Sequence, residues 1–397
     1  MRLSTRALSI QESAIRKLDA TVARFPDVHF HRLNIGQPDV ASPPEVLASF
    51  AENDGPVMAY GPASGTAECR RAAADFHAPS SPGLGPQHVV VTQGGSEALL
   101  FAMVGLCDPG DEILVPEPYY TNYNGFGTVA AAKVVPIPTR LDDGFAIPPD
   151  AVLDRYVTPR TRIFLFSNPG NPTGAVYPPE TLERVAAWCK RHGIWMVADE
   201  VYRRIWFDKL PVSALELRGY EDTVIMVDSM SKTFSLCGLR IGFLISRNEK
   251  FMERAERLGQ ARLGPQPRAQ RAAVRALRMP GSFYEEVRET YRRRVDAMMN
   301  ALAKVPDVAF HRPEGAFYTM ARLPVADTED FARFLVADFR DHSSGRPETV
   351  VVAPGPGFYA DPSSGRNEVR LAAVRNEQEL TRAIEVLGKG LAAYRAR

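Results

Sequence analysis

Short apolar runs alternate with longer amphipathic stretches over the first two thirds of the chain. The predicted strands are residues 88–92, 112–115, 133–137, 163–167, 194–198, 224–227 and 241–245. The predicted helices between them are residues 66–77, 96–106, 124–132, 148–156 and 179–192. Short strands rich in Val and Ile that alternate with helices predict an α/β fold, with a mostly parallel sheet sandwiched by helices. Ligands of such sheets bind beyond the carboxyl ends of the strands.

The remaining segments predict a smaller α+β unit. Before the sheet, we expect a helix over 4–24, a short strand over 31–38 and a helix over 43–52. After it, the predicted helices are residues 249–278 with a break near 264–267, 282–302, 328–338 and 377–393, and the predicted strands are 308–310, 316–320, 350–352 and 368–372. We therefore expect three parts: residues 1–45, an N-terminal segment that packs with the small domain; residues 46–284, the large domain; and residues 285–397, the small C-terminal domain.

Length and composition exclude several classes of protein. A chain of 397 residues is too long for one simple core. The net charge of +1 argues against a nucleic-acid-binding protein. The four cysteines lack zinc-like spacing and are too few for a disulfide framework, which fits a reducing, cytoplasmic location. The first ten residues lack a signal-peptide pattern and no run of 18 apolar residues occurs, so we expect no membrane association.

Lys232 is the first candidate for chemistry. It lies in the segment DSMSKTFSLCGLRIG, residues 228–242, just after an apolar strand. A desolvated lysine can form a Schiff base with a carbonyl compound, although most lysines are solvated surface groups. Two earlier segments, NPGNPTG at 168–174 and VADEVY at 197–202, have the order and spacing expected of an enzyme that uses pyridoxal 5'-phosphate (PLP).

Such an enzyme must also hold the ring of PLP. Asp199 follows an apolar strand and is the candidate acid for the pyridine nitrogen; otherwise it would cap a helix. Tyr202 and Asn171 are candidate donors to the ring oxygen, and Asn171 can also be a turn residue. Tyr120 is the candidate for stacking on the ring face.

The phosphate of PLP needs an anion site. The candidates lie directly before and at the start of a predicted helix, or on either side of Lys232 in the chain: Gly94, Gly95, Ser96, Ser229 and Arg240. Glycines allow backbone N–H groups to approach, a helix N-terminus favours an anion, and Arg240 would supply a fixed cation.

Together these segments resemble the fold-type I PLP-dependent aminotransferases of the aspartate aminotransferase (class I/II) family, over nearly the whole chain. The matching segments are NIGQPD at 34–39, Tyr60 with Gly65, GGSEA at 94–98, DPGDE at 108–112, NPGNPTG at 168–174, ADEVY at 198–202, SMSK at 229–232, RIG at 240–242, PEGAFY at 313–318 and EVRL at 368–371. Several of these motifs are specific, and they occur in the family's order.

The resemblance assigns further roles. It implies that Lys232 carries PLP and then moves a proton between the substrate Cα and C4' of the cofactor. It implies that Arg370 binds the substrate α-carboxylate, with Gly36 and Asn171 beside it. It also implies a homodimer with shared sites, in which Tyr60 reaches the cofactor phosphate of the partner subunit.

The chain departs from the aspartate pattern in two places. Tyr120 stands where many members have Trp or Phe, and Ser96 stands where some bacterial members have a lysine that helps to bind a distal carboxylate. Arg262 falls near the family's side-chain-carboxylate arginine and could read an acidic side chain across the dimer; a surface cation on a helix is an equal alternative.

The favoured function is a transaminase that moves an amino group from an L-amino acid, aspartate first, to a 2-oxo acid such as 2-oxoglutarate by ping-pong half-reactions. The alternative is a PLP-dependent lyase, cyclase or oxidase of specialised metabolism, because such enzymes would share Lys232, Asp199 and Arg370. A ligand-sensing domain of a transcription regulator is disfavoured, because only about 30 residues precede Asn34, too few for a DNA-binding domain.

Overall fold

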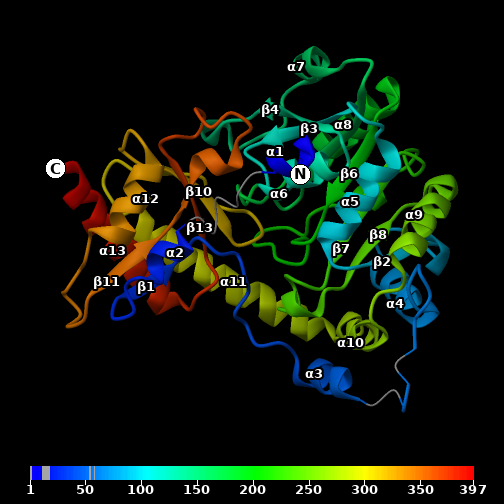
Figure 1. Cartoon of the computed structure of the whole chain (residues 1–397), viewed down its shortest axis with the longest axis horizontal. Helices are drawn as coiled ribbons and strands as arrows, with labels where there is room; N and C mark the ends of the chain where they lie inside the picture. Colours follow the sequence, from blue (N-terminus) through cyan, green and yellow to red (C-terminus); the bar gives the residue numbers. More distant parts are fainter. Residues whose placement is uncertain (1, 11–17, 53–54, 58) are drawn as a thin grey trace.

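A seven-stranded sheet forms the centre of the larger part of the molecule. The computed structural model describes residues 2–10, 18–52, 55–57 and 59–397 (Figure 1). The strands are β2 Val89–Thr92, β3 Glu112–Glu117, β4 Lys133–Pro138, β5 Thr161–Ser167, β6 Trp195–Asp199, β7 Val224–Ser229 and β8 Gly242–Ile245. They lie in the order β2-β8-β7-β6-β5-β3-β4, and β8 runs in the direction opposite to the other strands of this sheet. The predicted mostly parallel sheet is therefore confirmed.

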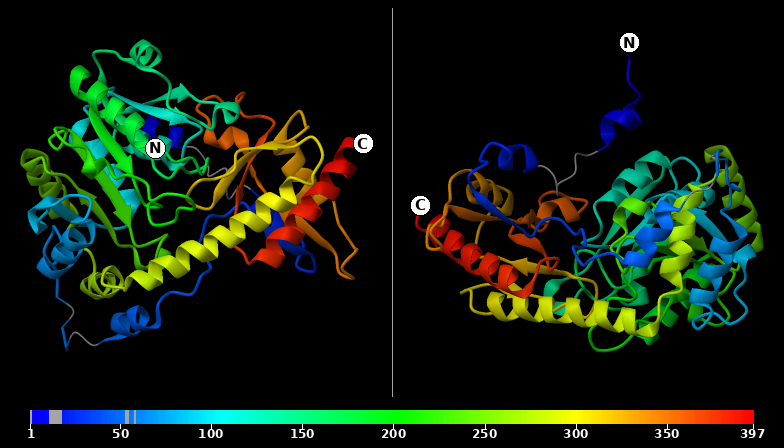
Figure 2. Two further views of the ribbon diagram at one scale, coloured as in Figure 1. Left: turned by 180° about the vertical axis from the view of Figure 1, so that it is seen from behind. Right: turned by 90° about the horizontal axis from the view of Figure 1, so that it is seen from below.

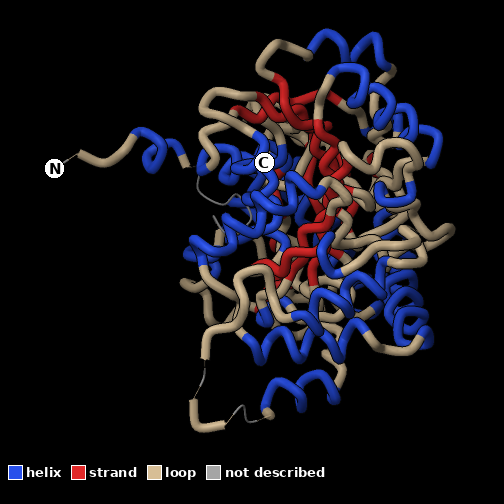
Figure 3. The backbone as a smooth tube through the Cα atoms, turned by 90° about the vertical axis from the view of Figure 1, so that its right-hand side faces the viewer, coloured by secondary structure: helices blue, strands red, loops and turns tan. Residues whose placement is uncertain are grey.

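Helices cover both faces of this sheet (Figure 3). They are α4 Ala67–His77, α5 Gly95–Leu106, α6 Asn122–Val129, α7 Asp150–Leu153, α8 Pro179–His192, α9 Glu249–Arg262 and α10 Pro267–Leu277. Successive residues of β6 enter different core clusters: Val197 packs with α5, whereas Met196 and Ala198 pack on the α8 side. This alternation buries the central strand on both faces, which explains its continuous apolar sequence.

The smaller part contains two further sheets. One is antiparallel and has the order β12-β13-β10-β9, formed by Ala353–Pro354, Glu368–Ala372, Tyr318–Arg322 and Ala309–Phe310. In the other, β1 (His29–Arg32) pairs in parallel with β11 (Glu348–Val351). Helices α12 (Thr328–Ala337) and α13 (Glu377–Arg395) pack on these strands. The domain boundaries after residues 45 and 284 stay predictions.

One long helix connects the two parts. Helix α11 (Gly281–Leu302) starts near α10 and runs along the molecule to pack against α13 (Figure 2). Its buried side chains include Val287, Tyr291, Met298 and Leu302. The predicted break before it is confirmed, because α9 ends at Arg262, Leu263 has a φ of 74°, and α10 begins with Pro267.

The N-terminal prediction is partly wrong. The structure has two short helices, α1 (Thr5–Ser9) and α2 (Asp19–Val22), in place of one helix over 4–24, and residues 11–17 lie outside the described residues. Ile10 is extended and ends α1, which buries no side chain that could stabilise a longer helix. The strand predicted at 31–38 begins earlier and ends at Arg32. Helix α3 (Pro44–Ala51) confirms the predicted start at a proline.

Within the described residues, we find no helix with the length and apolar character needed to cross a membrane.

Candidate active site

A cavity of about 570 Å³ lies at the carboxyl ends of the central strands. Strands β5, β6 and β7 are parallel neighbours, so the loops that follow them meet at one edge of the sheet. These loops bring Asn171, Asp199 and Lys232 into the cavity wall. The predicted site residues that line the cavity are Gly36, Gly95, Ser96, Tyr120, Asn171, Asp199, Tyr202, Ser229, Lys232, Arg240 and Arg370.

Lys232 lies three residues beyond the end of β7. Its Nζ donates a hydrogen bond of 2.9 Å to the carbonyl oxygen of Gly36 and lies 5.7 Å from the centre of the Tyr202 ring. The acceptor is neutral, so this contact does not form an ion pair. The amine is therefore positioned at the cavity by a contact that a covalent ligand can replace.

Asp199 ends β6 and is 4% exposed. The Tyr123 hydroxyl group donates a hydrogen bond of 2.8 Å to its Oδ2. Its other oxygen, Oδ1, is buried and has no hydrogen-bond partner among the described residues. Burial raises the pKa of Asp199 to about 6, and the hydrogen bond from Tyr123 opposes that rise. A buried carboxylate with an unfilled acceptor fits the protonated pyridine nitrogen of PLP.

The start of α5 forms a candidate phosphate site. Gly94 precedes the helix with a φ of 80°, and a Cβ atom on it would lie 2.6 Å from Nη2 of Arg240. This Nη2 donates to the carbonyl oxygen of Gln93 at 3.2 Å. The Ser229 hydroxyl group, 2.9 Å from the Ser231 hydroxyl oxygen, lies in the same cavity wall. Free N–H groups of the first turn, one cation and hydroxyl groups are the donors that a phosphate needs.

Aromatic side chains line the cavity. The Tyr120 hydroxyl oxygen accepts a hydrogen bond of 2.8 Å from Asn122 Nδ2, and its ring meets Tyr123 edge to face at 5.5 Å between centroids. The hydroxyl oxygens of Tyr202 and Tyr318 are 3.1 Å apart. Burial raises the pKa of Tyr120 to about 12, so its hydroxyl group stays protonated at neutral pH.

Arg370 comes from β13 and is 1% exposed. Its Nη1 donates to Asn171 Oδ1 at 3.1 Å and its Nη2 to the carbonyl oxygen of Asn34 at 2.6 Å. The guanidinium carbon lies 4.5 Å from the centre of the Tyr318 ring and 4.9 Å from that of Phe358. Its Nε is buried without an acceptor among the described residues, and burial lowers the pKa of Arg370. A buried cation whose two acceptors are uncharged favours an anionic ligand.

Three predicted residues do not line the cavity: Gly94, which lies directly before α5, and Tyr60 and Arg262, which lie farther away. Tyr60 is 87% exposed. Arg262 Nε lies 3.1 Å from Glu97 Oε2, and its Nη2 donates to the carbonyl oxygen of Val91 at 3.1 Å. A role for Tyr60 or Arg262 in binding a ligand of the active site therefore depends on a second subunit.

Sequence reasoning assigned no role to two residues of the site, Tyr123 and Tyr318. Tyr123 lies in the first turn of α6, whereas Tyr120 precedes that helix, so no helical spacing relates the two and no local signal indicated Tyr123. Tyr318 ends the segment PEGAFY. Its hydroxyl oxygen would lie 1.7 Å from a Cβ atom on Gly36, which explains why only glycine fits there.

Comparison with known proteins shows the family. Residues 28–387 match the model of the aminotransferase class I and II family. The chain is 33% identical over 402 aligned positions to an aspartate/prephenate aminotransferase of Thermus thermophilus, covering 98% of this chain and 99% of that protein. It is 34% identical to an arginine–pyruvate transaminase of Pseudomonas aeruginosa, over 72% of this chain and 74% of that protein.

Solved structures are similar over the full length. The aspartate aminotransferase of Thermus thermophilus with maleate has a TM-score of 0.88 and 29% identity, covering 98% of this chain and 100% of that chain. An alanine aminotransferase of Pyrococcus furiosus has a TM-score of 0.89 and 27% identity, covering 99% and 100%. The chain therefore belongs to the class I and II aminotransferases of fold type I and is a transaminase.

Proposed function

We propose that this transaminase uses PLP, held by Lys232, to move an amino group between an L-amino acid and a 2-oxo acid. One observation carries the proposal. The same cavity is lined by Lys232, Asp199 and Arg370. They supply an amine, a carboxylate with an unfilled acceptor, and a buried guanidinium group whose partners are uncharged. These groups match the aldehyde and the pyridine nitrogen of the cofactor and the α-carboxylate of the substrate.

The residues that would hold the cofactor come from separate elements. Lys232 would bind its aldehyde, Asp199 its pyridine nitrogen, and Asn171 with Tyr202 its ring oxygen. The ring would pack against Tyr120. The phosphate would bind to the donors at the start of α5 and beside it, which come from Gly94, Gly95, Ser96, Ser229 and Arg240. When bound, PLP supplies an electron sink for the electron pair left on the substrate Cα after its proton is removed.

The chain's own groups orient the substrate and move the proton. Arg370 binds the α-carboxylate through its N–H groups, and the stacking of its guanidinium group between Tyr318 and Phe358 fixes the direction of these donors. The Lys232 amine would take the proton from the substrate Cα and deliver it to C4' of the cofactor, as a general base and then a general acid. Asp199 would keep the proton on the pyridine nitrogen, because a negative charge beside that nitrogen favours its protonated form, and Oδ1 has no protein partner among the described residues.

We propose aspartate as the first amino donor and 2-oxoglutarate as an acceptor, in ping-pong half-reactions. Similar proteins are named as aspartate/prephenate, arginine–pyruvate and alanine aminotransferases, so membership of the family does not identify the amino donor. The donor depends on the residues that contact the substrate side chain. The cations that line the cavity, Lys232, Arg240 and Arg370, already have roles. A second carboxylate would therefore be read by Arg262 of a homodimer's other subunit, and Tyr60 would reach the neighbouring phosphate.

Borohydride reduction tests the covalent part of the proposal. The purified enzyme is loaded with PLP, reduced, digested and analysed by mass spectrometry. We expect the added mass on the peptide that contains Lys232, and no added mass on it in Lys232→Ala. Modification of other lysines with an unmodified Lys232 peptide would contradict the assignment.

A further inference from the structure

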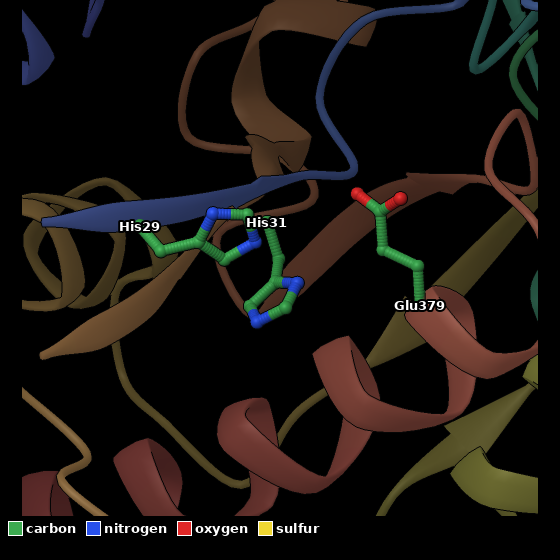
Figure 4. A group of neighbouring side chains, drawn as sticks. All are labelled: His29, His31 and Glu379. Atoms are coloured by element: carbon green, nitrogen blue, oxygen red, sulfur yellow. The ribbon is translucent and has the colours of Figure 1, made fainter. Parts of the chain in front are cut away.

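Three side chains capable of binding a metal lie together on the smaller part of the molecule, away from the proposed active site. His29 and His31 are alternate residues of β1, and Glu379 lies in the first turn of α13 (Figure 4). One ring nitrogen of each histidine and one carboxylate oxygen of Glu379 lie within 4.8 Å of one another. The three side chains come from two elements, β1 and α13, that lie far apart in the sequence.

His31 is oriented in the way that metal-binding histidines usually are. It is 3% exposed, and its Nε2 lies 2.9 Å from Glu348 Oε2. Because a carboxylate accepts, the hydrogen of the neutral ring lies on Nε2, and Nδ1 keeps its lone pair. That Nδ1 is buried and has no hydrogen-bond partner among the described residues. A carboxylate on one ring nitrogen and a ligand on the other is the usual arrangement around a metal ion.

The other two side chains can move to complete the site. His29 and Glu379 are partly exposed, and the two histidine rings meet edge to face at 4.5 Å between centroids. Ligand atoms bound to one Zn²⁺ at about 2.0–2.2 Å in tetrahedral geometry lie about 3.4 Å apart. The partly exposed side chains of His29 and Glu379 therefore have to rotate inward to close the site. The Arg375 Nε to Glu379 Oε1 contact is 3.8 Å long and partly exposed, so it competes weakly for the carboxylate.

The carboxylate behind His31 belongs to a network of ion pairs. Glu348 accepts from His31 and also forms an ion pair with Arg382. Arg382 in turn contacts Asp341 Oδ2 at 2.6 Å. Each of these groups therefore already has a partner, and only Nδ1 of His31 is buried and directed to no protein group among the described residues.

We propose that His29, His31 and Glu379 bind one divalent transition-metal ion, best matched by Zn²⁺, with water in the remaining position. Two imidazole nitrogens and one carboxylate oxygen suit this ion, whereas Mg²⁺ and Ca²⁺ prefer oxygen ligands. The ion joins α13 to β1. Strand β1 leads to Asn34, whose carbonyl oxygen accepts from Arg370 at 2.6 Å. The ion therefore holds the backbone segment that precedes the acceptor of the buried arginine.

The test is zinc chloride titrated into the tag-free, cofactor-loaded enzyme after treatment with a chelator, followed by calorimetry. We expect one strong site per chain and a melting temperature that rises with zinc. His29→Gln and Glu379→Gln, which change partly exposed groups, should each weaken zinc binding by more than about tenfold. Both variants should keep the wild-type circular dichroism spectrum and cofactor content.

Two matched variants serve as controls. Glu377→Gln changes a carboxylate of the same helix turn, which pairs with Arg293, and His192→Gln changes a histidine that pairs with Asp154. Both should bind zinc like the wild type. Absence of a strong zinc site in the wild type, or equal affinity in His29→Gln and Glu379→Gln, would overturn the proposal. Because the readout is zinc binding, the result does not depend on the proposed substrate.

Discussion

The Tyr123 hydroxyl group donates a hydrogen bond of 2.8 Å to Asp199 Oδ2, which leaves Oδ1 as the buried oxygen without a partner among the described residues. Tyr123 belongs to α6 and Asp199 ends β6, so packing of a helix against the sheet fixes the carboxylate. The hydrogen bond limits the number of orientations that the carboxylate can adopt. One oxygen is thereby reserved for a ligand of the cavity.

Asp199→Asn should stabilise the cofactor-free protein and weaken its binding of PLP. Burial raises the pKa of Asp199 from 3.8 to about 6, so the native state binds this proton more tightly than the unfolded state. Its contribution to stability therefore falls as pH rises from about 4 to about 6, by up to about 3 kcal/mol. Urea unfolding of both proteins at pH 4 and pH 7 measures the difference.

We expect the stabilisation of Asp199→Asn at pH 7 to shrink near pH 4, where the buried Asp199 of the folded wild type is protonated and therefore neutral like Asn. Titration with PLP should show weaker binding by the variant. Asp154→Asn, which changes an exposed carboxylate, is the control and should alter neither quantity. A variant that is less stable without cofactor, yet binds PLP like the wild type, would mean that Asp199 has a structural role.

Arg370→Lys should raise the KM for amino acids and lower kcat/KM. Lysine keeps the charge but cannot present two parallel N–H groups, and it loses the stacking between Tyr318 and Phe358. Loss of a hydrogen bond to a charged group costs about 2 kcal/mol, or roughly 30-fold in kcat/KM.

Steady-state kinetics with a single donor measure this effect. Arg322→Lys is the matched control, because Arg322 is a partly exposed arginine of the neighbouring strand that pairs with Asp142. It should leave both constants unchanged. If Arg370→Lys had an unchanged kcat/KM, the α-carboxylate would have another partner.

Arg262→Leu should lower the preference for aspartate over alanine if Arg262 reads a side-chain carboxylate in the partner's site. The ratio of the two kcat/KM values is the measurement, because a general loss of activity cancels in it. Arg262 also pairs with Glu97 in its own chain, so Glu97→Gln is a second variant to compare. Arg257→Leu changes another arginine of α9 and is the control. An unchanged ratio in Arg262→Leu would exclude the role.

Mixed dimers test the shared site. Tyr60→Ala and Lys232→Ala subunits should each have little activity alone when PLP is limiting. If Tyr60 acts in the partner's site, a dimer with one subunit of each kind contains one site with both wild-type residues. We therefore expect activity to appear when the two proteins are unfolded together and refolded. If each subunit used its own Tyr60, no site would be intact and mixing would restore nothing.

The sequence predicted the residues at strand ends because apolar runs mark strands and parallel strands bring their carboxyl ends together. Asp199 ends β6, and Asn171 and Lys232 lie in the loops that follow β5 and β7. The resemblance to a known family added Arg370, which comes from a different sheet. Neither source predicted which side chains support these groups.

The contacts of Tyr123 and Tyr318 could not be predicted because they join segments far apart in the chain. Tyr318 contacts Tyr202 and Gly36, 116 and 282 residues away. The pairing of Arg262 with Glu97 spans two helices and likewise has no local pattern. The N-terminal helix was overestimated because periodicity alone does not show whether a helix has a surface to pack against; α1 buries none of its side chains.

The half-reaction tests the central claim, that these residues perform transamination, most directly. The cofactor-loaded enzyme is titrated with aspartate in the absence of any 2-oxo acid, and the cofactor and the product are followed by absorbance and mass spectrometry. We predict that each site releases one oxaloacetate and retains the amino group of aspartate on the cofactor, as pyridoxamine phosphate. Release of ammonia, or consumption of oxygen with the cofactor unchanged, would contradict transamination and favour a lyase, cyclase or oxidase.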